Sequence, residues 1–139
     1  MKKYQTMIIA LAALFVFGCG APPTEKIVSP TETVKIFVEA SKAKDAKSVQ
    51  SVLSKGTLVL MESNAKKQNT TVEDLLTRNI GPQVNEVPEM RNELIEDETA
   101  TVEVKSSPND FEKIPFVKEE GVWKIALDKF ITEALNKSR

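Results

Sequence analysis

The sequence predicts an α+β fold in which N-terminal helices pack on an antiparallel sheet of about four strands, followed by a short C-terminal helix. Two observations predict this class. Apolar residues recur every three or four positions as far as residue 80, and every second position after Pro82. Polar turns separate the later segments, which favours an antiparallel meander.

The first two helices are expected to begin at strong capping residues. Ser29 suits the N-cap of a helix that starts at Pro30, and Glu32 completes a capping box. Asp45 is expected to cap a second helix, and Gly56 to end it. The residues expected to face the core are Val34, Phe37, Val38 and Ser41 in the first helix, and Val49, Val52 and Leu53 in the second.

Two further helices are expected before the period changes. One covers residues 57–67, where Leu58, Leu60 and Met61 are apolar. The other follows the capping signature at Thr70 and ends at Gly81-Pro82. Its apolar stripe consists of Val72, Leu75, Leu76 and Ile80.

Strands are expected over 83–95, 99–105, 111–118 and 122–127. Pro115 cannot donate a ladder hydrogen bond, so an edge position or a bulge is expected there. Gly121 suits the tight turn before the last strand because glycine accepts positive φ. The positions expected to face inward are Ala100, Val102, Val104, Trp123, Ile125 and Leu127.

The last helix and the only mature tryptophan complete the expected core. Asp128 is expected to cap a helix that offers Phe130, Ile131, Ala134 and Leu135 for packing. Trp123 is expected to pack against Phe37 and Val38 of the first helix. The alternative is that its ring lines a ligand cavity.

The N-terminus has the pattern of an export signal. Lys2 and Lys3 precede an unbroken apolar run of 11 residues, Met7 to Phe17. A helix of that length spans about 16 Å, whereas the hydrocarbon core of a bilayer is about 30 Å thick. The run is therefore too short for a transmembrane helix and suits the apolar region of a signal peptide.

The residues Val16-Phe17-Gly18-Cys19 resemble the cleavage site of a bacterial lipoprotein signal peptide. In that family a small residue, here Gly18, precedes a cysteine that is acylated and becomes the mature N-terminus; Phe17 departs from the usual small residue. Cleavage after Ala21 is the alternative, and Pro22 disfavours it. We expect a signal peptide at 1–18, the lipidated N-terminus and tether at 19–28, and one domain at 29–139.

Composition excludes several classes of function. Removal of residues 1–18 leaves 121 of the 139 residues, enough for one core. It removes two of the 19 basic residues and none of the 20 acidic ones, so the net charge becomes −3. That balance lacks the basic footprint of a nucleic-acid binder. A single cysteine also excludes an intramolecular disulfide.

No catalytic constellation is recognisable in the sequence. The chain has no histidine, and its only tyrosine, Tyr4, lies in the expected signal peptide. Histidine-dependent triads and histidine or thiolate zinc sites are therefore excluded. Glu96-Asp97-Glu98 is the densest acidic run, but it lacks the spacing of a calcium loop and is interpreted as a solvated turn. We expect no enzyme activity, metal or cofactor, and Cys19 is the only site residue.

The mature chain resembles small bacterial lipoproteins of the nuclear transport factor 2-like superfamily, also described as cystatin-like. The residues that carry the resemblance are Ser29-Pro30 with Phe37, Lys44-Asp45-Ala46, and Glu120-Gly121-Val122-Trp123-Lys124-Ile125. The resemblance implies a curved sheet that wraps the helices into a cone with space for a cavity. It implies no particular activity, because this fold hosts many functions.

Two functions for an envelope lipoprotein remain open. The domain is either a protein-interaction module for another envelope protein or a binder of a small apolar ligand in the cone. The bulky inward positions slightly favour the first. The residue after Cys19 is Gly20, not the aspartate that marks inner-membrane retention in lipoproteins of enteric-type bacteria. The lipoprotein resemblance therefore implies the outer membrane of a diderm host, or otherwise the outer face of the cytoplasmic membrane.

Cys19→Ala tests the anchor. Without the acylated sulfur, the protein is expected to leave the membrane fraction for the soluble one, or to stay unprocessed. Cell fractionation with mass measurement of the N-terminus checks this. A processed variant that still sediments with membranes contradicts the lipoprotein interpretation.

Overall fold

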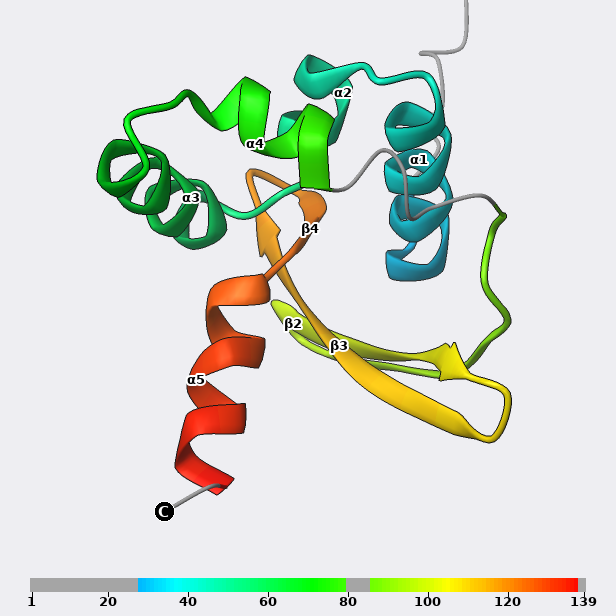
Figure 1. Cartoon of the computed structure of the whole chain (residues 1–139). Helices are drawn as coiled ribbons and strands as arrows, with labels where there is room; N and C mark the ends of the chain where they lie inside the picture. The colour runs from blue at the N-terminus through cyan, green and yellow to red at the C-terminus, as the bar shows by residue number, and fades with distance from the viewer. Residues whose placement is uncertain (1–27, 80–85, 138–139) are drawn as a thin grey trace, which may run out of the picture.

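The computed structural model describes residues 28–79 and 86–137. Four helices come first, then four strands, then a final helix (Figure 1). Their bounds are α1 Pro30–Lys42, α2 Ala46–Ser51, α3 Lys55–Lys67, α4 Val72–Asn79, β1 Met90–Glu96, β2 Thr99–Ser107, β3 Asp110–Glu119, β4 Val122–Ile125 and α5 Leu127–Lys137. The predicted α+β class is confirmed. The predicted end of α4 at Gly81-Pro82 lies outside the described residues.

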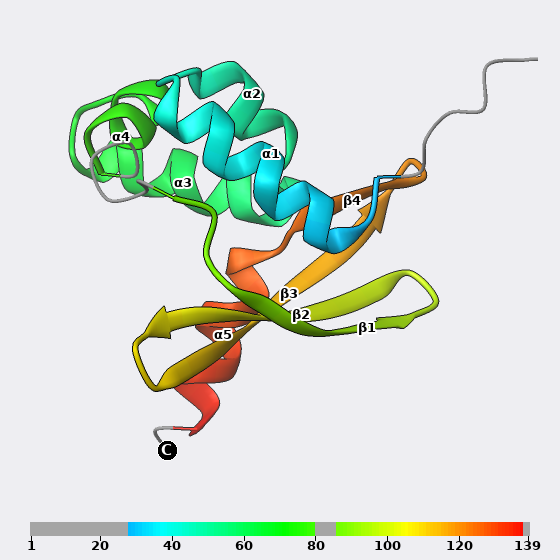
Figure 2. The same cartoon turned by 90° about the vertical axis from the view of Figure 1, so that its right-hand side faces the viewer.

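The strands form one antiparallel sheet in the order β1-β2-β3-β4. The sheet is open, with β1 at one edge. Figure 2 shows α1 to α4 on one side of it, while α5 runs away from them. The β3–β4 turn has positive φ at both Glu120 and Gly121, which matches the tight turn predicted there.

The N-terminal end of α1 is held by its own cap and by β1. Ser29 Oγ accepts a hydrogen bond from the Glu32 N–H at 3.2 Å, as the capping pattern predicts. The Thr31 N–H donates to the Glu93 carboxylate at 2.8 Å. The pairing of β1 shifts register between Arg91 and Leu94, and Asn92 has a φ of 51°, so the glutamate that reaches α1 lies in a bulge.

The core lies between α1, α2 and α4 and the inner face of the sheet. Val102, Phe116 and Val38 are almost completely buried within it. Trp123 is 4 % exposed and belongs to the same cluster as Val38, with Phe37 packed against that cluster. The predicted core position of Trp123 is confirmed.

Gly56 does not end the second helix, contrary to the prediction. The α2 helix stops at Ser51, and Ser54 caps α3 by accepting from the Thr57 N–H at 3.0 Å. Gly56 therefore lies in the first turn of α3. A Cβ at this position would overlap Asp128 Oδ2. The absence of a side chain at Gly56 therefore makes room for the first turn of α5, and it does not end a helix.

Asp128 also differs from its predicted role as an N-cap. The last strand ends at Ile125 and α5 begins at Leu127, so Asp128 lies in the first turn and not at the N-cap. The hydroxyls of Ser54 and Thr57 each donate to its Oδ1 at 3.0 Å. The carboxylate thus joins the start of α5 to the start of α3.

Pro115 occupies an interior strand, with β2 on one side and β4 on the other. Its carbonyl accepts from the Ala126 N–H at 2.9 Å, just beyond the last residue of β4. The carbonyl and the absent N–H of a strand residue point to the same side. The proline is tolerated because the side on which it cannot donate faces past the end of β4.

Gly56→Ala is expected to lower the free energy of unfolding by about 1–3 kcal/mol, because Asp128 must leave its two hydroxyl donors. In an Asp128→Ala background the same change is expected to stabilise by up to about 1 kcal/mol, as alanine favours helix. Urea denaturation of the unsubstituted protein, the two single variants and the double variant checks both signs. If Gly56→Ala changed the free energy of unfolding equally in the two backgrounds, overlap with Asp128 would not be the cause of the destabilisation.

Candidate functional site

An apolar pocket of about 280 Å³ lies between α1 and the inner face of the sheet. Two helices, three strands and the segment before β1 contribute to it. The lining residues are Val34, Phe37 and Val38 of α1, Val104 of β2, Ile114 of β3, Ile125 of β4, Leu127 of α5, and Glu86 and Pro88 from the segment before β1.

Regular secondary structure places these side chains together. Val34, Phe37 and Val38 follow the i, i+3, i+4 spacing that puts residues on one face of a helix. Val104 lies on the same face of β2 as the buried Val102, because alternate strand residues share a face. The periodic residues that build the core therefore also build the pocket.

The pocket runs from the core to solvent. Val34, Val38 and Ile125 are buried, whereas Phe37, Val104 and Leu127 are half-buried. Glu86 is exposed and is the one charged residue in the lining. A ligand entering here would exchange water for aliphatic and aromatic carbon and would meet a carboxylate at the exposed part.

The volume sets the size of ligand that fits. An engineered apolar cavity of about 150 Å³ holds benzene, so by proportion a pocket of 280 Å³ suits an apolar group of about ten non-hydrogen atoms. The lining offers surface for burial and one carboxylate. Small-molecule sites in general combine apolar walls, which supply affinity, with a few polar groups that set orientation.

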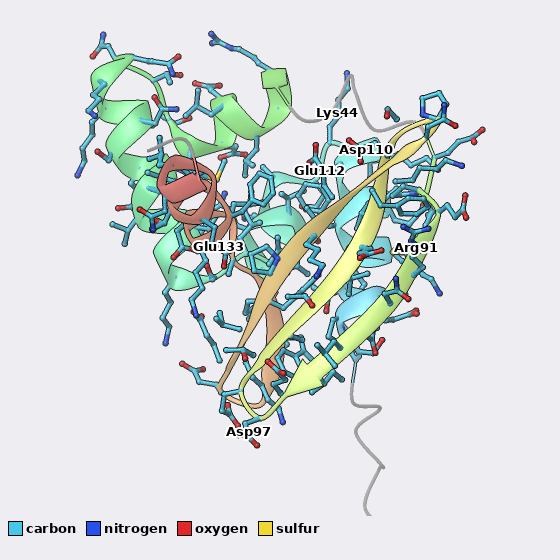
Figure 3. The ribbon with its side chains drawn as sticks, turned by 90° about the horizontal axis from the view of Figure 1, so that it is seen from below. Lys44, Arg91, Asp97, Asp110, Glu112 and Glu133 are labelled. Atoms are coloured by element: carbon cyan, nitrogen blue, oxygen red, sulfur yellow. The ribbon has the colours of Figure 1, made fainter. Side chains whose placement is uncertain are left out.

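The acidic run considered as a metal site lies elsewhere. Asp97 is in the β1–β2 turn, at the opposite end of the sheet from Asp110 (Figure 3). Across residues 28–79 and 86–137, no group of three or more acidic, histidine or cysteine side chains could hold a metal ion. Cys19, the predicted lipidation site, lies outside the described residues.

Charged side chains pair with one another on the other face of the sheet. Arg91 lies 3.7 Å from the centre of the Phe111 ring and 2.8 Å from the Glu103 carboxylate. Hydrogen bonds from Arg91 and Asn92 lower the pKa of Glu103. Figure 3 shows Arg91 extending from β1. These contacts stabilise the sheet and are not part of the pocket.

Sequence reasoning identified most of the apolar lining, but only as core. Val34, Phe37, Val38, Val104, Ile125 and Leu127 were all predicted to face inward. Ile114 was not named among the inward positions, and Glu86 and Pro88 were assigned to a strand expected over 83–95, whereas β1 begins only at Met90. The one signal that could have placed Glu86 and Pro88 at the pocket was their position just before the first strand, where the chain passes from the helices to the sheet.

Comparison with protein-family models, with curated proteins and with solved structures finds no match to this chain. The resemblance to nuclear transport factor 2-like lipoproteins therefore stays a prediction. Within the described part of the chain, no helix has the length and apolar character needed to cross a bilayer.

Val104→Phe and Val102→Phe form a matched test of the pocket. Phenylalanine at position 104 can extend into the pocket, so the free energy of unfolding should change by less than about 1 kcal/mol. Val102 is fully buried and does not line the pocket, so the same change should cost about 1–3 kcal/mol. Urea denaturation checks this. If both variants lost the same free energy of unfolding, the pocket beside Val104 would not have room for the phenylalanine ring.

Proposed function

We propose that this protein is a lipid-anchored, non-enzymatic binder of a small apolar ligand. Cys19 would hold it at an exported membrane face, either the outer membrane or the outer face of the cytoplasmic membrane. The pocket beside α1 would receive the ligand. The observation that carries the proposal is the pocket of about 280 Å³ with eight apolar lining residues and one charged one.

The energetics of burial support a ligand of this kind. Apolar surface removed from water contributes roughly 25 cal/mol per Å². Binding to a small pocket that already exists needs little reordering of the protein, which lowers the entropic cost. The pocket is near the lower limit of the sizes that usual ligand sites have, roughly 300 Å³. The expected ligand is accordingly small, with modest affinity.

The interaction module is the second candidate, and one observation favours it. Leu94 and Ile95 on the edge strand β1 are 55 % and 49 % exposed. However, β1 also carries Arg91, Glu93 and Glu96 together with a bulge. Charges and bulges are the devices that keep sheet edges from pairing with other strands. The pocket therefore supports ligand binding better than this edge supports a protein partner.

Octan-1-ol is a suitable neutral probe because its size matches the pocket. The test uses the full chain in nanodiscs of zwitterionic lipid, with isoleucine methyl groups labelled for NMR. We expect saturable shifts at Ile114 and Ile125, which line the pocket, and none at the exposed Ile36, Ile95 and Ile131.

Val104→Phe provides the control, because the added ring occupies the same space. The shifts at Ile114 and Ile125 should disappear in this variant while the fold is retained. Absence of saturable shifts in the unsubstituted protein would overturn the ligand-binding proposal. So would shifts of the same size in Val104→Phe.

A further inference from the structure

We infer that the ligand of the pocket carries a protonated amine, or a similar cation, that pairs with Glu86. The apolar body would lie against α1 and the sheet, and the positive end would lie at the exposed part of the pocket. This inference rests on the proposed ligand-binding function and adds the chemical class of the ligand.

The charge of the lining is the first observation. Eight of its nine residues are apolar, and the ninth is a glutamate. Neither lysine nor arginine lines the pocket. A fatty acid or another anion would therefore bring its negative end towards Glu86 with no lining cation to offset the repulsion. A cation at the same place gains an attractive partner.

The second observation is that neighbouring acids are already engaged. Glu89 pairs with Lys105 at 2.8 Å, and Glu103 pairs with Arg91 at 2.8 Å. Glu93 accepts from the Thr31 N–H of α1. Among the residues that the structure describes, Glu86 takes part in no ion pair or side-chain hydrogen bond. It is the carboxylate of this region that lines the pocket and remains available to a ligand.

The position of Glu86 defines how the ligand would be oriented. The residue is exposed, so the cation would keep part of its hydration and the ion pair would be screened by solvent. Burial of the apolar body would supply most of the affinity, and Glu86 would select the charge of the head group. The expected class is a primary amine on an apolar body of about ten non-hydrogen atoms.

Three probes with one alkyl chain separate head-group charge from apolar burial. They are n-octylamine, octan-1-ol and octanoate, each titrated into the full chain in zwitterionic nanodiscs at neutral pH. Apparent affinity is read from the methyl shifts of Ile114 and Ile125. Because partition into the lipid is the same for every protein variant, the ratio between variants reports the protein alone.

Glu86→Gln is the decisive variant, and Glu62→Gln on α3 is its matched control. Both remove one exposed negative charge, but Glu62 does not line the pocket. Glu86→Gln is expected to weaken octylamine binding about two- to fivefold, the range for a water-exposed ion pair, and to leave octanol binding unchanged. Octanoate should bind more tightly to Glu86→Gln than to the unsubstituted protein. Glu62→Gln should change none of the three.

The outcomes distinguish this inference from the function on which it rests. If octanol binds but Glu86→Gln leaves octylamine affinity unchanged, or lowers it no more than Glu62→Gln does, the cationic class is wrong and the binding function stands. If octanoate binds the unsubstituted protein more tightly than octylamine, the class is also wrong. If no probe shifts Ile114 and Ile125, the ligand-binding function itself fails.

Discussion

The carboxylate of Asp128 is the contact on which the arrangement of the C-terminal half depends. It accepts hydrogen bonds from Ser54 and Thr57 at the start of α3, and it occupies the space that Gly56 leaves open. Next to it, the Ser54 N–H donates to the Ile125 carbonyl. Together these bonds fix where β4 ends and where α5 begins. Because Leu127 is the first residue of α5, they also set the position of one wall of the pocket.

A second set of contacts fixes α1 over the sheet and explains why space remains beneath it. The first turn of α1 is held by Glu93 of β1, and the Thr33 hydroxyl lies within reach of the Trp123 carbonyl at 3.5 Å. Both contacts lie in the N-terminal half of the helix. Further along, Phe37 and Val38 face Val104 of β2, whose side chain is too short to fill the gap. The pocket therefore results from where the helix is anchored.

The sequence predicted the secondary structure well because local signals agree with the fold. Ser29-Pro30 and Glu120-Gly121 each form the structure that their residue types favour in isolation. Gly56 was misinterpreted because its role depends on Asp128, 72 positions later in the chain. A cavity was raised only by the family resemblance, and the apolar pattern itself could not predict the pocket, for a related reason. A pattern of apolar residues shows which side chains face inward, but it does not show whether they meet.

The existence of the pocket has an energetic consequence for function. Apolar side chains that face a solvent-accessible pocket forgo the burial and dispersion contacts of a packed core, so such a pocket lowers the stability of a small domain. A larger residue in place of Val104 could reduce that loss. A ligand that fills the space restores those contacts and, by mass action, stabilises only the folded state. Binding and folding are thus coupled in this domain, and the walls of the pocket belong to the same core that holds the fold together.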